Sequence, residues 1–204
     1  MNIRAATTLG LVLSAVPLLQ GCFPVVAGGV AAGVLAVDDR RTLATQAEDK
    51  TIFAKAESRI AERLGDRAHV NVTSFNRRVL LTGEVPDAAT RGEAERIAGG
   101  VENVASVVNE LQVAGISSLT ARANDSLITS KVKGNMVDER NLQANAFKVV
   151  TEASVVYLMG LVTREEGDLG ARVAARTSGV KQVVKVLDYV PVAPRGGTAA
   201  NPPK

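Results

Sequence analysis

The sequence predicts an α+β fold of two small tandem domains, each with a three-stranded sheet packed on two helices in the order helix, strand, strand, helix, strand. Three observations lead to this prediction. The chain has 204 residues, enough for one ordinary domain or two small ones. A sequence pattern recurs about 77 residues further on, and each copy changes from helical to strand periodicity in the same order. Aromatic residues make up only 3% of the chain, so we expect thin cores of Val, Leu, Ile and Ala.

Each copy of the repeat opens with a helical pattern, in which apolar residues follow an acidic residue at every fourth position. The first copy reads Asp49, Ile52, Ala56 and Ile60, and the second reads Asp125, Ile128, Val132 and Met136. This spacing places the apolar residues on one helix face. We therefore expect two helices that begin at the acidic residues.

Two alternating apolar segments that close on glycine follow each helix. They are residues 70–73 and 79–83 in the first copy and 147–150 and 156–160 in the second. The short loops between them predict hairpins. Downstream comes a second helix and then a last strand, expected over residues 106–113 and 181–190. Because a helical crossover precedes it, this strand can pair in parallel with a hairpin strand.

The N-terminus has the features of a lipoprotein signal. A basic residue, Arg4, precedes the apolar stretch 9–19, and Leu19-Gln20-Gly21-Cys22 follows. We therefore predict a signal peptide over residues 1–21 and acyl chains on Cys22. The alternative is a transmembrane helix over residues 5–37 with a buried cysteine, but prolines and glycines interrupt that stretch.

The remaining boundaries follow from composition and from the repeat. We assign residues 22–47 to the acylated N-terminus and tether, 48–114 to the first domain and 121–190 to the second. Residues 191–204 are rich in proline and glycine and are expected to be a disordered tail.

The chemistry-bearing residues do not predict a catalytic site. The chain has one histidine, His69, and its one cysteine is the predicted acylation site. Neither a Cys–His couple with a free thiol nor a multi-histidine metal site can therefore be assembled. Glu165 and Glu166 stand at an expected helix N-terminus, where they complement the helix dipole. The net charge of +3 is balanced and does not predict nucleic-acid binding. We expect a protein that is not an enzyme and has no cofactor, no metal and no nucleic-acid partner.

One surface is a candidate for binding a membrane. In the helix from Asp125, Leu127 lies off the apolar stripe, on a face with Ser130 and Lys131, and Lys133 is nearby. An exposed apolar residue beside lysines suits an anionic bilayer surface. The alternative is that Leu127 packs against the first domain and that the lysines are simply solvated. The candidate phospholipid-binding residues on this helix are Leu127, Ile128, Ser130, Lys131, Val132, Lys133 and Met136.

The repeated units resemble a known family. Residues 79–83 with 100–104, and 157–162 with 178–183, are similar to the BON (bacterial OsmY and nodulation) domain, and two such domains after a lipobox resemble dual-BON outer-membrane lipoproteins. The resemblance implies binding of anionic phospholipid through the first helix of the second domain, a place at the division site and support of envelope integrity. Relatives carry an aromatic residue where Leu127 stands.

Two functions remain open from the sequence. The first is a phospholipid-binding module anchored in the outer membrane and facing the periplasm; Phe23, rather than Asp, follows the cysteine, which in bacterial lipoprotein sorting favours the outer membrane. The second is a periplasmic interaction module whose domain pair docks onto another envelope protein, with lipid serving only as the anchor. Flotation of residues 38–204 with anionic vesicles discriminates between them.

Overall fold

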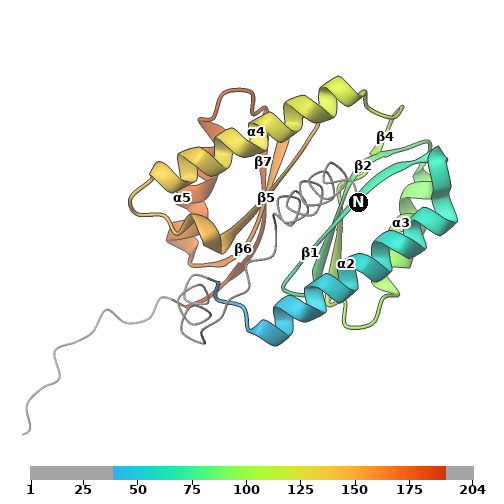
Figure 1. Cartoon of the computed structure of the whole chain (residues 1–204), viewed down its shortest axis with the longest axis horizontal. Coiled ribbons are helices and arrows are strands. Elements are labelled where there is room, and N and C mark those ends of the chain that lie inside the picture. The colour runs from blue at the N-terminus through green and yellow to red at the C-terminus, as the bar shows by residue number, and fades with distance from the viewer. Residues whose placement is uncertain (1–38, 192–204) are drawn as a thin grey trace, which may run out of the picture. The chain divides into compact units, whose positions relative to one another are not determined.

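The computed structural model describes residues 39–191 (Figure 1). The predicted signal peptide, Cys22, most of the tether and nearly all of the predicted tail lie outside the described residues. Residues 38–204 form one compact unit, and all of the hydrophobic clusters found among the described residues lie within it.

The described residues form two α+β units with the predicted order of elements. The first contains α2 (Leu43–Leu64), η2 (Gly65–Arg67), β1 (His69–Phe75), β2 (Arg78–Val85), α3 (Ala88–Gly99), β3 (Ser106–Asn109) and β4 (Gln112–Val113). The second contains α4 (Leu119–Asp138), η3 (Ala144–Ala146), β5 (Phe147–Glu152), β6 (Val155–Val162), α5 (Arg164–Ala175) and β7 (Gln182–Tyr189). The predicted fold class is confirmed.

The two sheets have the same topology. In the first, β2 pairs antiparallel with β1 and parallel with β3; in the second, β6 pairs antiparallel with β5 and parallel with β7. The glycines that close the hairpins occupy equivalent register positions, since Gly83 faces Val70 and Gly160 faces Phe147. The predicted hairpins and the parallel third strand are therefore confirmed in both copies.

The helix starts differ from the prediction. Helix α2 begins at Leu43 and α4 at Leu119, and the side chains of Thr42 and Ser118 accept the N-terminal backbone hydrogen bonds. Asp49 and Asp125, expected at the helix N-termini, lie inside the helices and are buried. The prediction was wrong because their acidity serves a tertiary contact and not a helix cap.

That tertiary contact is with the hairpin turns. The Asp49 carboxylate accepts hydrogen bonds from the backbone amides of Asn76 and Arg77, at 2.7 and 2.8 Å. The Asp125 carboxylate accepts from the equivalent turn residues, Ala153 and Ser154, both at 2.9 Å. All four turn residues have positive φ, as a two-residue type I′ turn requires. The buried carboxylates stabilise these turns and connect each first helix to its sheet.

The last strand of the first unit is interrupted. The continuous strand expected over residues 106–113 forms as β3 and β4, which both pair with β2. Between them, Leu111 is buried in the core of the unit, and the amide of Glu110 donates to the carbonyl of Leu81. The interruption lets Leu111 fill the core.

Three hydrophobic clusters hold these units together. One lies between helices and sheet in the first unit and one in the second. The third joins the other faces of the two sheets and contains Phe75, Leu80, Tyr157, Met159 and Val186. Strands β2 and β6 are consequently buried on both faces, which explains their nearly continuous apolar sequence.

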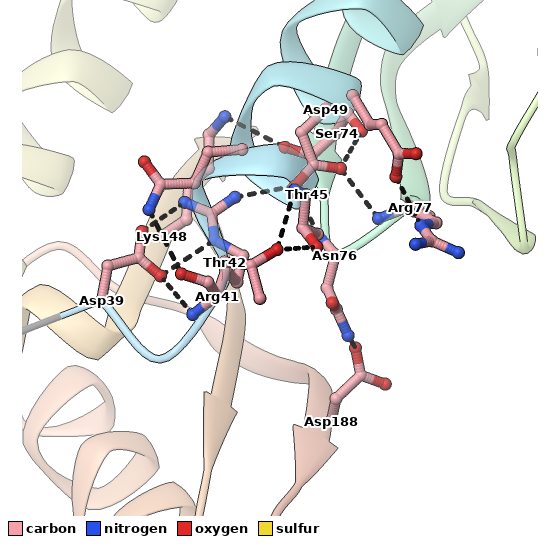
Figure 2. A network of polar contacts seen from close by, with 12 residues as sticks. Asp39, Arg41, Thr42, Thr45, Asp49, Ser74, Asn76, Arg77, Lys148 and Asp188 are labelled. Atoms are coloured by element: carbon pink, nitrogen blue, oxygen red, sulfur yellow. Dashed lines mark hydrogen bonds and ion pairs between the residues drawn. The ribbon is translucent and has the colours of Figure 1, made fainter. Parts of the chain in front are cut away.

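The segment before α2 contacts both units. Arg41 pairs with Asp39 and Asp49 (Figure 2). Its guanidinium also lies 3.9 Å from the centre of the Phe75 ring. Its neighbour Arg40 makes a bidentate pair with Glu166 of the second unit, at 2.6 and 2.7 Å. We call residues 39–41 the arginine strap.

Candidate lipid-binding surface

Helix α4 presents one face to the core and the other to solvent. Its buried residues are Asp125, Ile128, Val132 and Met136. Three of these are candidate phospholipid-binding residues, yet their side chains are at most 1% exposed. They match the stripe expected to face the sheet, and their side chains belong to the core and not to the exposed surface.

The other four candidate residues lie at the surface. Leu127 is 61% exposed, so it does not have the buried packing that the alternative interpretation requires. Ser130, Lys131 and Lys133 are also exposed. Within the described part of the chain neither lysine forms an ion pair. The Ser130 hydroxyl donates to the Ser126 carbonyl in the preceding turn. The two lysines supply the positive charge of this face.

The structure adds apolar residues that the sequence prediction missed. Leu119 and Val137 are 79% and 70% exposed. Leu119, Ala123 and Leu127 follow one another at intervals of four residues, and Ala123 is also exposed. Such spacing aligns them on one face of the helix. Leu119 was missed because the helix was expected to begin at Asp125; periodicity on the face opposite the core could have revealed it.

The same face of α2 has a different character. Thr51 occupies the place of Leu127, because both stand two residues after the buried aspartate. Glu57 occupies the place of Lys133, and both residues of α2 are exposed. The two helices therefore share a core stripe, while only α4 combines a central exposed leucine with unpaired lysines.

Positive charge continues from α4 onto the neighbouring strand. Partial burial, the Arg41 guanidinium and the Lys133 ammonium together lower the pKa of Lys148 in β5. The Lys148 ammonium donates to the carbonyl of Ser74 at 3.4 Å. This crowding of cationic groups means that an anion near Lys133 and Lys148 is electrostatically favoured.

The expected role of Glu166 as a helix-terminal residue is confirmed. Thr163 and Glu166 form a capping box at the start of α5. The Arg40 guanidinium and the Thr163 amide hold the pKa of Glu166 down to about 2. This carboxylate is therefore committed to structural contacts.

Comparison with known proteins identifies the repeated unit. The BON domain family model matches the chain twice, over residues 49–115 and 124–191. This chain belongs to the BON-domain family. Each BON domain thus coincides with one helix, hairpin, helix and strand unit of the structure.

Two relatives match this chain over most of its length. The chain is 36% identical over 192 residues to "Outer membrane lipoprotein DolP" of Haemophilus influenzae, covering 93% of this chain and 100% of the relative. It is 30% identical over 154 residues to "21 kDa hemolysin" of Actinobacillus pleuropneumoniae, covering 74% and 79%. The chain is therefore a DolP-like, dual-BON envelope lipoprotein.

The solved structures add little to this comparison. The C-terminal domain of CdsD, a structural protein of the type III secretion system of Chlamydia trachomatis, matches with 11% identity and a TM-score of 0.29, covering 65% of this chain and 96% of that chain. Among the described helices none has the length and apolar character needed to cross a membrane.

Proposed function

We propose that this protein is anchored in the outer membrane by acyl chains on Cys22, faces the periplasm and binds anionic phospholipid through helix α4 of its second BON domain. The observation that carries the proposal is the exposed face of α4, where Leu127 stands beside the unpaired Lys131 and Lys133. By this binding the protein supports envelope integrity, including at the division site. The proposal assigns no catalysis.

The expected affinity of α4 alone is low. A lysine near an anionic surface contributes about 1 kcal/mol, and complete burial of a leucine side chain contributes at most about 1.5–3 kcal/mol. The anchor makes such weak binding effective, because it raises the local concentration of the domain at the membrane. The name of the DolP relative, an outer membrane lipoprotein, supports the same location.

Vesicle flotation of residues 38–204 tests the site without the anchor, because this segment contains the three hydrophobic clusters found in the structure. The protein should float with vesicles containing phosphatidylglycerol and remain in the dense fractions with pure phosphatidylcholine. Leu127→Glu should weaken binding at least tenfold, because it replaces an inserted apolar group with a repelled carboxylate. Raising the salt concentration should also weaken binding, because the Debye length is about 8 Å at physiological ionic strength and shortens above it.

The chain offers a matched control for that variant. Thr51→Glu places the same carboxylate at the equivalent exposed position of α2 and should leave flotation unchanged. Equal loss in both variants would show that net charge, and not α4, governs binding. Absence of flotation by the parent would favour the second candidate function, docking of the BON pair onto an envelope protein.

The anchor is tested separately by mass spectrometry of the membrane-extracted protein. The mature chain should begin at Cys22 and carry acyl chains, and Cys22→Ser should release the protein from the outer-membrane fraction. An intact Met1, or membrane retention of Cys22→Ser, would contradict the anchor while leaving the vesicle result valid.

A further inference from the structure

Three side chains with metal-ligand chemistry meet where the two BON domains contact each other. They are His69 at the start of β1, Glu84 near the end of β2 and Glu152 at the end of β5. Their ligand atoms all lie within 4.8 Å of one another. The first two are register partners in the β1–β2 hairpin, whereas Glu152 comes from the second domain.

Both carboxylates of this cluster are shielded from water. Glu84 and Glu152 are buried, at 6% and 5% exposure. His69 Nδ1 lies 3.0 Å from Glu84 Oε2, and the Asn71 amide donates to Glu152 Oε2 at 2.7 Å. Two carboxylates held together away from water are stabilised when a cation joins them.

A cavity lies beside two of the three residues, His69 and Glu152, while Glu84 is not part of its lining. This cavity of about 220 Å³ is lined by His69, Asn71, Arg122, Asp125, Thr129 and Glu152, among others. This volume exceeds what an ion with one bound water needs. The Arg122 guanidinium is engaged with the carbonyl of Ser117, at 2.9 Å.

Ser117 is a neighbour of Glu84 on the connection between the two domains. Its amide donates to Glu84 Oε2 at 3.3 Å. Its hydroxyl oxygen is buried and has no hydrogen-bond partner within the described part of the chain. Buried polar atoms are almost always paired, and this unpaired hydroxyl belongs to a residue whose backbone amide contacts Glu84.

We propose that His69, Glu84 and Glu152 form a binding site for a divalent transition-metal ion, best matched by Zn²⁺, at the contact between the two BON domains. One imidazole nitrogen and two carboxylate oxygens are a ligand set that Zn²⁺ takes in proteins, with water completing four-coordination. Asn71 and the Ser117 amide already orient the two carboxylates, as outer-shell groups do around metals. Because both domains supply ligands, the ion connects them.

Sequence reasoning excluded a multi-histidine site because the chain has a single histidine. It could not find this combination, since the ligands lie at positions 69, 84 and 152 without a metal-binding spacing. The site and the lipid surface use different residues: the three ligands belong to strands, and the α4 residues that line the cavity are not among the candidate lipid contacts. Either proposal can fail without the other.

Isothermal titration of residues 38–204 with ZnCl₂, after treatment with a chelator, tests the site. The parent should bind one Zn²⁺ per chain. Glu152→Gln and His69→Gln should each weaken binding at least tenfold, because each removes one of three ligands. Glu57→Gln, which makes the same charge change on the exposed face of α2, should bind like the parent. No saturable binding by the parent, or equal binding by all variants, overturns the proposal.

A spectroscopic measurement keeps the test decisive if a variant is unstable. His69 is the sole histidine, so the ring nitrogens of the parent give one unambiguous pair of ¹⁵N signals. Zn²⁺ should shift the Nδ1 signal to the metal-bound range and leave Nε2 protonated. A histidine spectrum that does not change at saturating Zn²⁺ would overturn the proposal irrespective of the variants.

Discussion

Replacing the buried Asp49 tests how the first BON domain is held together. Besides the two turn amides, its carboxylate accepts hydrogen bonds from the Ser74 hydroxyl and the Arg41 guanidinium, both at 2.8 Å (Figure 2). Asp125 accepts only the two turn amides among the hydrogen bonds found in the described chain. The two variants Asp49→Ala and Asp125→Ala therefore remove unequal sets of contacts from equivalent positions.

The magnitudes follow from these contacts. Hydrogen bonds to a charged group contribute about 1.5–3 kcal/mol each, but the turn residues are exposed or only partly buried, so water replaces part of the loss. Breaking a buried ion pair costs about 3–5 kcal/mol, which we expect for Asp49→Ala. For Asp125→Ala we expect about 1.5–3 kcal/mol. At about 2–4 °C per kcal/mol for a unit of this size, Asp49→Ala should lower Tm by about 6–20 °C.

Urea denaturation followed by far-ultraviolet circular dichroism, together with calorimetry, measures both losses on residues 38–204. Asp66→Ala is the control, because Asp66 is exposed and its replacement should change the free energy of unfolding by less than about 0.5 kcal/mol. The reasoning is refuted if Asp49→Ala costs no more than Asp125→Ala, or if both variants unfold like the control.

Three further predictions concern the strap, a glycine and a buried phenol. Arg40→Ala should lower the free energy of unfolding by about 1–2 kcal/mol at pH 6. Because the folded-state pKa of Glu166 is depressed from 4.5 to about 2, the difference in stability between variant and parent should shrink as the pH falls through that window. A difference that stays constant with pH would exclude the ion pair as its source. Gly83→Ala should strongly lower the melting temperature, because a Cβ there would lie 2.0 Å from the carbonyl oxygen of residue 69 at a φ of +113°. Gly92→Ala is the control: it lies in open space on α3 and should stabilise the protein by up to about 1 kcal/mol. Equal effects of the two substitutions would contradict the close approach of β1 and β2. Burial raises the pKa of Tyr157 to about 12, so absorbance at 295 nm should show a late phenolate step that Tyr157→Phe removes. A titration in which both tyrosines ionise with midpoints near the ordinary value of about 10 would refute the burial.

Much of the fold could be predicted from local sequence patterns. The element order could be predicted from the four-residue apolar spacing that starts at Ile52 and Ile128, from the short hairpin loops and from the repeat itself. These signals are local, because burying one face of a helix or strand imposes a regular spacing on neighbouring residues. The same spacing placed Leu127 and Lys131 on the exposed face of α4.

The parts that local patterns did not show depend on contacts between distant residues. Asp49 and Asp125 were interpreted as helix starts, because sequence cannot distinguish an acid that complements a helix dipole from one that binds a hairpin turn 27 residues away. The two sheets pack on each other through Leu80 and Met159. This contact joins the sheet faces that do not carry helices, and the local sequence pattern does not show which faces meet.

The sequence by itself thus determined the repeated secondary structure, the predicted signal and the charged face of α4, since these follow from neighbouring residues. Only the tertiary structure decided that His69 lies beside Glu84 and Glu152, and that the arginine strap holds both domains through Glu166 and Asp49. The physical reason is that polar groups taken out of water need partners, and the fold supplies these partners from residues 8 to 126 positions apart.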